Sequence, residues 1–140
     1  MGRRRQAREL ALKVLFQMDR GVQPLARVCA YTFENAAASP ETLAYARRLA
    51  EGVTAEREDI DERLAGRTHH WRLDRLSAVD RNVLRLGAYE MPRCPEVPRD
   101  VVINEAIEIA KKYCAEESGR FVNGVLDGLP GGHPAPGKKK

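Results

Sequence analysis

Apolar residues recur every three or four positions along most of the chain, which is the spacing of amphipathic helices. Near the N-terminus these positions are Ala7, Leu10, Ala11, Val14, Leu15 and Met18. At about 100° per residue they fill an arc of roughly 140° on a helical wheel. Gly21 is a plausible end for this helix, and the pattern predicts a first helix from about residue 3 to residue 20.

Prolines and helix caps divide the first half further. Pro24 suits the first turn of a second helix, which we expect to run to about Ala38. Ser39, followed by a proline, has the pattern of a cap and opens a third helix. We expect that helix to break or kink at residues 52–54 and to end at Gly66.

The second half begins with a connection and continues with two long helices. Ser77 and Asp80 have the spacing of a capping box, and the helix that they open is apolar on two sides, which is typical of a central helix. The segment PRCPEVP at 92–98 carries three prolines in seven residues and is predicted to be a loop. Pro98 opens the next helix, which we extend through residue 117.

The stretch GRFVNGVLDGL at 119–129 carries two conflicting signals. Asn123-Gly124 is typical of a tight β-hairpin turn, yet the apolar residues around it recur at helical spacing. A hairpin here would have very short arms and no partner sheet. We therefore predict a helix with Ser118 as its N-cap, at a cost of about 1 kcal/mol for the internal glycine. That cost suggests a close helix–helix approach at Gly124.

These elements predict an all-α fold of two small helical bundles packed together, with about seven helices. We expect one domain over residues 1–130, with subdomains at 1–66 and 67–130. The tail at 131–140 has no apolar pattern and is predicted to be a disordered basic tail.

Composition favours a cytoplasmic protein. No stretch approaches the roughly 18 apolar residues that a membrane span needs, and no apolar run follows the basic start as in a secretory signal. The three cysteines are widely separated, so we interpret them as free thiols in a reducing compartment. We therefore expect no membrane contact.

The sequence carries few motifs that are typical of enzymes. The chain has no phosphate-binding GxxxxGK[ST] loop, no GxGxxG and no HExxH motif. The three histidines, His69, His70 and His133, lack partners at metal-ligand spacing. We expect no enzyme activity, no metal site and no cofactor, and a binding role is the better default.

The net charge of the whole chain is modest at +4, but arginines are concentrated at its start. Arg4, Arg5 and Arg8 lie within about 100° of one another on a helix, next to Arg3 in sequence. Positive charge at a helix N-terminus opposes the macrodipole, so the fold gains nothing evident from the cluster. An external anion would relieve the repulsion, and arginine holds phosphate bidentately. The alternative is a frayed, solubilising arm without a ligand.

A second candidate is the corner EESGRFVNG at 116–124. Phe121 would lie in the first turn of the last helix beside Arg120, where an aromatic ring can stack on an unpaired base while the guanidinium holds phosphate. Glu117 could accept a hydrogen bond from a base amino group. Alternatively, Phe121 is simply a core residue.

Four stretches together resemble the NusB family of bacterial transcription antitermination factors. They are RRRQARELALKVLFQ at 3–17, VDRNVLRLGAYEM at 79–91, VPRDVVINEAIEIAKKYCAEES at 97–118 and FVNGVLDGL at 121–129. INEAIEIAK combined with FVNGVLD is the most specific part of the resemblance, which spans residues 3–129.

The resemblance implies binding to a single-stranded boxA-type RNA element jointly with a NusE-type small-subunit ribosomal protein. It implies a role in the RNA polymerase antitermination complex, promoting read-through in ribosomal RNA operons. The residues that it places on the RNA side are Arg3, Arg4, Arg5, Arg8, Glu117, Arg120 and Phe121. It places Asp80 and Arg81 near the ribosomal protein. Four neutralised phosphates would give a salt slope near −3, at about −0.7 each.

The residues alone are also compatible with two other functions. One is an RNA-binding module related to that of ribosomal RNA cytosine methyltransferases, which would need a cofactor domain with strands and a glycine-rich loop. The other is a protein-interaction scaffold whose arginines only aid solubility. An exposed apolar face could also support a homodimer.

Overall fold

The computed structural model describes residues 2–68 and 73–130. Over these residues the chain forms helices and no strand, which confirms the all-α prediction. The elements are α1 (Gly2–Arg20), α2 (Leu25–Glu34), α3 (Pro40–Ala55), α4 (Arg57–Ala65), the 3-10 turn η1 (Leu73–Arg75), α5 (Ala78–Arg93), α6 (Arg99–Tyr113) and α7 (Glu116–Asp127).

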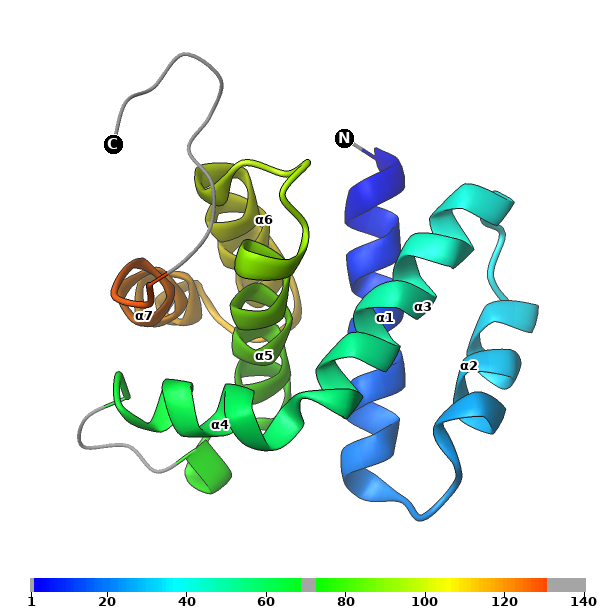
Figure 1. Cartoon of the computed structure of the whole chain (residues 1–140), viewed down its shortest axis with the longest axis horizontal. Helices are drawn as coiled ribbons and strands as arrows, with labels where there is room; N and C mark the ends of the chain where they lie inside the picture. The colour runs from blue at the N-terminus through cyan, green and yellow to red at the C-terminus, as the bar shows by residue number, and fades with distance from the viewer. Residues whose placement is uncertain (1, 69–72, 131–140) are drawn as a thin grey trace.

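Helix α5 lies at the centre of the molecule (Figure 1). It contacts α1 and α3 on one side and α4, α6 and α7 on the others, while α2 covers α1 at the far end. Every residue from Asn82 to Met91 is buried, which confirms the prediction from its two apolar stripes. The division into subdomains at residue 66 stays a prediction; in the structure α4 packs chiefly against α5 rather than against the helices that precede it.

Two of the predicted caps are present. The Ser39 side chain accepts a hydrogen bond from the Thr42 amide, and the Ser77 side chain accepts one from the Asp80 amide. Both serines therefore satisfy an amide that the first turn of a helix would otherwise leave without a partner. The Asp80 carboxylate does not complete the capping box.

Several helix boundaries differ from the sequence prediction. Helix α2 ends at Glu34 instead of near Ala38, and the third helical segment breaks at Glu56 instead of at 52–54. Helix α5 continues through Pro92 to Arg93, since a proline in the last turn removes only one backbone donor. The predicted helix through residue 117 ends at Tyr113, and a new helix begins at Glu116.

The glycine prediction was wrong. Gly124 lies within α7, but a Cβ atom there would meet nothing within 4 Å. Close approaches occur at other glycines, for example at Gly87 of α5, where a Cβ would lie 2.7 Å from Cδ1 of Leu126 on α7. Gly87 therefore lets α5 and α7 pack together, whereas Gly124 is open to solvent.

The three cysteines are free, as expected; Cys29 and Cys94 are buried and Cys114 is exposed. The predictions for His69, His70, His133 and the tail fall outside the described residues. Within residues 2–68 and 73–130, no group of histidine, cysteine and acidic side chains could hold a metal ion. No described helix is long and apolar enough to cross a membrane.

Candidate nucleic-acid interface

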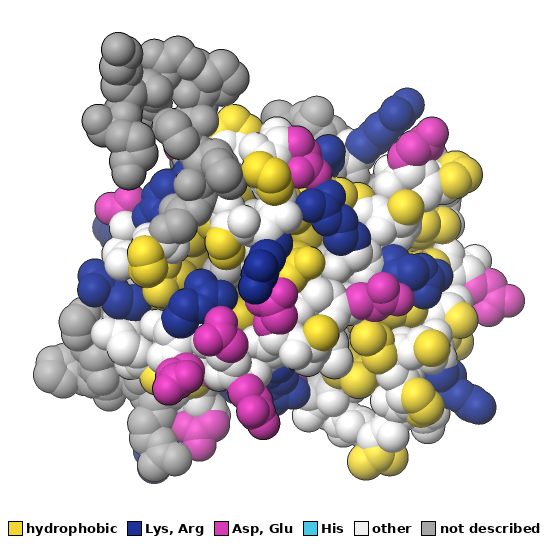
Figure 2. All heavy atoms as spheres, in the orientation of Figure 1, with side chains coloured by type: hydrophobic (Ala, Val, Ile, Leu, Met, Phe, Trp, Pro, Cys, Tyr) yellow, Lys and Arg dark blue, Asp and Glu magenta, His cyan; other side chains and the backbone are white. Residues whose placement is uncertain are grey.

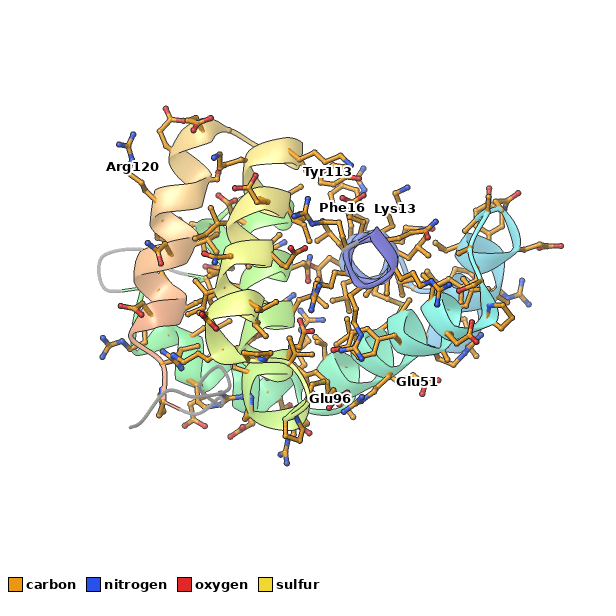
Figure 3. All side chains as sticks on the ribbon, turned by 90° about the horizontal axis from the view of Figure 1, so that it is seen from above. Lys13, Phe16, Glu51, Glu96, Tyr113 and Arg120 are labelled. Atoms are coloured by element: carbon orange, nitrogen blue, oxygen red, sulfur yellow. The ribbon has the colours of Figure 1, made fainter. Side chains whose placement is uncertain are left out.

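The end of α6 and the start of α7 form an exposed corner with a cation beside an aromatic ring. Arg120 is exposed and projects away from α7 into solvent (Figure 3). Phe121 is half-buried against the edge of the core, so it is neither a fully interior residue nor a free ring. Both residues lie in the second turn of α7, one turn later than predicted, because the helix begins at Glu116.

The same corner holds residues that sequence reasoning missed. Tyr113, at the end of α6, is 38% exposed, and the Lys112 ammonium lies 5.2 Å from the centre of its ring. The Tyr113 hydroxyl donates to Glu9 of α1 at 2.8 Å, and Lys112 donates to the same carboxylate. An aromatic residue directly after two lysines in AKKYC was the available signal. We call Lys112, Tyr113, Glu117, Arg120 and Phe121 the α6–α7 corner.

The four arginines of α1 do not act as one cluster. Arg3 and Arg4 are exposed. The Arg4 guanidinium lies over the Tyr45 ring of α3, 4.2 Å from its centre, which is a cation–π geometry. This contact holds Arg4 against the protein surface while its donors remain open to solvent.

Arg5 and Arg8, in contrast, bind carboxylates of the same chain. Arg5 donates two hydrogen bonds to Glu105 of α6. Arg8 donates from Nε and Nη2 to Glu90 of α5, at 2.9 and 2.7 Å. The Arg8 side chain is 5% exposed and that of Glu90 is 1% exposed. The inference that the fold gains nothing from these arginines was therefore wrong.

Tyr45 completes the buried part of this network. Its hydroxyl donates to Oε2 of Glu90 at 2.6 Å. Burial, and next the negative charge of Glu90, raise the pKa of Tyr45, so the hydroxyl stays a proton donor. On α6, the hydrogen bond from Arg5 lowers the pKa of Glu105 and keeps it ionised. These contacts join α1, α3, α5 and α6 at the basic end of α1.

The two residues expected near a protein partner are also engaged within the chain. Arg81 donates to Oδ2 of Asp19 at 3.1 Å and to the carbonyl of Leu76 at 3.0 Å. Burial opposes ionisation of Asp19, but the Asn82 hydrogen bond and the nearby arginines outweigh it and lower its pKa. Asp80 accepts a hydrogen bond from Ser118 of α7.

The opposite face of the molecule carries charge of both signs. In Figure 2 basic and acidic side chains lie next to one another across this face. Arg48 binds Glu96 at 2.6 Å, and Arg93 binds Glu56 at 3.1 Å. Figure 3 shows Glu96 and Glu51 on this side, and Arg120, Tyr113, Phe16 and Lys13 on the other. The basic side chains of this face are therefore partly neutralised by acidic neighbours.

Known proteins match this chain over most of its length. The model of the NusB family matches residues 5–130. A transcription antitermination protein NusB from Sorangium cellulosum is 47% identical over 127 residues, covering 91% of each chain. The crystal structure of T. maritima NusB superposes with a TM-score of 0.81 at 40% identity, covering 89% of this chain and 87% of that one.

A second solved structure contains ligands. It is a crystal structure of the antitermination factors NusB and NusE in complex with double-stranded RNA. Its matched chain has a TM-score of 0.81 and 30% identity to this protein, covering 91% of this chain and 95% of that one. The match over nearly the whole length and the shared helical fold lead to one conclusion: the chain belongs to the NusB family, a non-enzymatic family of transcription antitermination proteins.

Proposed function

We propose that this protein binds a single-stranded, boxA-type RNA in the cytoplasm jointly with a NusE-type small-subunit ribosomal protein. The complex would act within the RNA polymerase antitermination complex and promote read-through in ribosomal RNA operons. The observation that carries this proposal is the exposed Arg120 beside the half-buried Phe121, on a chain of this family. The family relative in complex with NusE and RNA supports both partners.

We propose that the predicted arginines have two different roles. Arg3, Arg4 and Arg120 have exposed guanidiniums and are proposed to contact phosphate. Arg5 and Arg8 are proposed to shape the surface through their carboxylate partners. Three phosphate contacts give an expected salt slope of about −2, at roughly −0.7 per phosphate on a single strand.

Phe121 supports a single strand as the ligand. A ring at the surface can stack only on a base that is not already stacked in a duplex, and such stacking contributes about 1–3 kcal/mol per base. Glu117, exposed one turn earlier, can accept a hydrogen bond from a base amino group. The relative was crystallised with double-stranded RNA, so the comparison of single-stranded with double-stranded RNA is the most informative part of the test.

Fluorescence titration with boxA-type RNA tests the proposal. We expect the single strand to bind more tightly than its duplex, and more tightly again when the ribosomal protein is present. Arg120→Ala should weaken binding, and the matched control Arg27→Ala, on α2 at the other end of the molecule, should leave it unchanged. Equal affinity for any polyanion, unaffected by the ribosomal protein, would contradict the proposal, and the absence of any RNA binding would favour the scaffold.

The partner contact and a homodimer belong to the same proposal. The start of α5, with Asp80 and Arg81, is proposed to lie near the ribosomal protein. The most exposed large apolar residues, Val22 and Tyr31, are proposed as the contact between two copies. Light scattering of the free protein and of the complex gives the mass of each. A monomer at all concentrations would contradict the proposed homodimer.

A further inference from the structure

The first turn of α7 lacks a cap of its own. Its N-cap residue is Ala115, which has no side-chain oxygen to accept from the free amides of the turn. The next two residues, Glu116 and Glu117, are exposed. This turn nevertheless precedes Arg120 and Phe121 directly, so whatever fixes it also fixes the α6–α7 corner.

A carboxylate from another helix reaches this turn. The Ser118 hydroxyl, in a residue only 7% exposed, donates to Oδ2 of Asp80 at 3.2 Å. Beside this bond, Ser77 Oγ lies 3.7 Å from Sγ of Cys114, in the connection between α6 and α7. The start of α5 therefore touches the start of α7 and the connection that precedes it.

The second oxygen of Asp80 is unusual. Oδ1 is buried and has no hydrogen-bond partner among the described residues. A buried acceptor without a partner costs free energy, and a charged acceptor costs more than a neutral one. The helix geometry supplies a compensation, because Asp80 is the third residue of α5 and its partner is the third residue of α7. Two helix N-termini, each with a partial positive charge, therefore meet at this carboxylate.

We infer that Asp80 is a positioning residue for RNA binding: through its hydrogen bond to Ser118, it holds the uncapped start of α7 so that Arg120 and Phe121 face the RNA. This inference rests on the proposed function. Asp80 thus acts on the RNA through α7 without touching it.

The sign of one mutational effect separates this role from simple electrostatics. Removing a negative charge near a site for a polyanion should tighten binding. Removing a positioning carboxylate should weaken it. We expect Asp80→Ala to weaken single-stranded RNA binding about three- to tenfold, the range of one lost hydrogen bond. Asp127→Ala, at the other end of α7, is the matched loss of an acidic residue and should not weaken it.

Further readouts localise the effect. Ser118→Ala should weaken binding as much as Asp80→Ala, and the double variant should be no worse than either single variant. The salt slope should stay unchanged, because no phosphate contact is lost. Asp80→Asn keeps an acceptor oxygen but not the charge, so it should recover part of the affinity.

Amide hydrogen exchange measures, without RNA, how firmly Asp80 holds the start of α7. We expect faster exchange at residues 116–121 in Asp80→Ala and Ser118→Ala, with little change in α2. If the wild-type protein binds no RNA, the proposed function fails. Hydrogen exchange still shows whether the Asp80–Ser118 contact holds the start of α7. Tighter RNA binding by Asp80→Ala, additive losses, or unchanged exchange at 116–121 would each overturn the inference.

Discussion

Two of the arginines predicted to bind RNA, Arg8 and Arg120, behave differently in the structure. Arg8 of α1 lies inside the molecule and binds Glu90 through two nitrogens, whereas Arg120 of α7 projects into solvent. The sequence makes the first group look like the stronger candidate, since four arginines crowd eight residues. The difference teaches that the density of charge along a chain does not decide which charges a ligand can reach. The carboxylates that other helices bring to each position decide it.

The largest effect is expected from a mutation that breaks the buried Arg8–Glu90 pair. Glu90→Ala leaves the Arg8 guanidinium buried without a carboxylate, and such a change costs about 3–5 kcal/mol. Urea unfolding measures the loss. Replacing both Arg8 and Glu90 by methionine should cost less, because no unpaired charge remains. If Arg8→Ala weakened RNA binding yet kept the full free energy of unfolding, Arg8 would belong with Arg120 instead.

The next effect concerns the aromatic ring of the corner. Phe121→Ala should weaken single-stranded RNA binding by about 1–3 kcal/mol, the value of one base–aromatic stack. Phe121→Leu is the control for its half-buried side, since it keeps apolar packing but has no ring face. Anisotropy titration should show nearly the same loss for both variants. Full affinity in Phe121→Leu would mean that Phe121 serves packing alone.

A smaller effect separates the two kinds of arginine by their salt response. Arg120→Gln should reduce the salt slope by about 0.7, the contribution of one phosphate on a single strand. Arg5→Gln should leave the slope close to the wild-type value, because Arg5 already binds Glu105. Titrations at several salt concentrations measure both. Equal reductions in the two variants would erase the proposed distinction between them.

The smallest effect is a pH dependence of stability. The hydrogen bond from Arg5 lowers the pKa of Glu105 below its ordinary value of 4.5. The stabilisation is therefore complete above about pH 4.5 and is lost as the pH falls through the lowered pKa. Urea midpoints measured down through this range should fall less steeply in Glu105→Gln and in Arg5→Gln. A wild-type slope in both variants would show that the pair contributes nothing.

Much of the fold follows from local signals. Apolar periodicity predicted the helices, and serine caps fixed the starts of α3 and α5. The start of α7 was missed because Ser118 looked like a cap, although Glu116 and Glu117 fit the first turn of a helix through its macrodipole. Ser118 instead bonds a residue 38 positions away. No local pattern contains such a pairing.

The site was predictable only in part for the same reason. Arg120 and Phe121 are neighbours in sequence, so their combination was visible, and the structure leaves Arg120 exposed and Phe121 half-buried. The partners of Arg5 and Arg8 are 100 and 82 positions away. Periodicity locates a residue on its own helix but does not say which side chain a second helix places opposite it.

The long separation between Arg8 and Glu90 also matters while the chain is being made. Synthesis proceeds at about 5–20 residues per second, so the 82 residues between the two take roughly 4–16 seconds to translate. During that interval the first guanidiniums leave the ribosome before their own carboxylates exist. The start of the nascent α1 therefore carries uncompensated positive charge at the surface of a particle built largely of RNA, and Arg5 and Arg8 are neutralised only once α5 and α6 are complete.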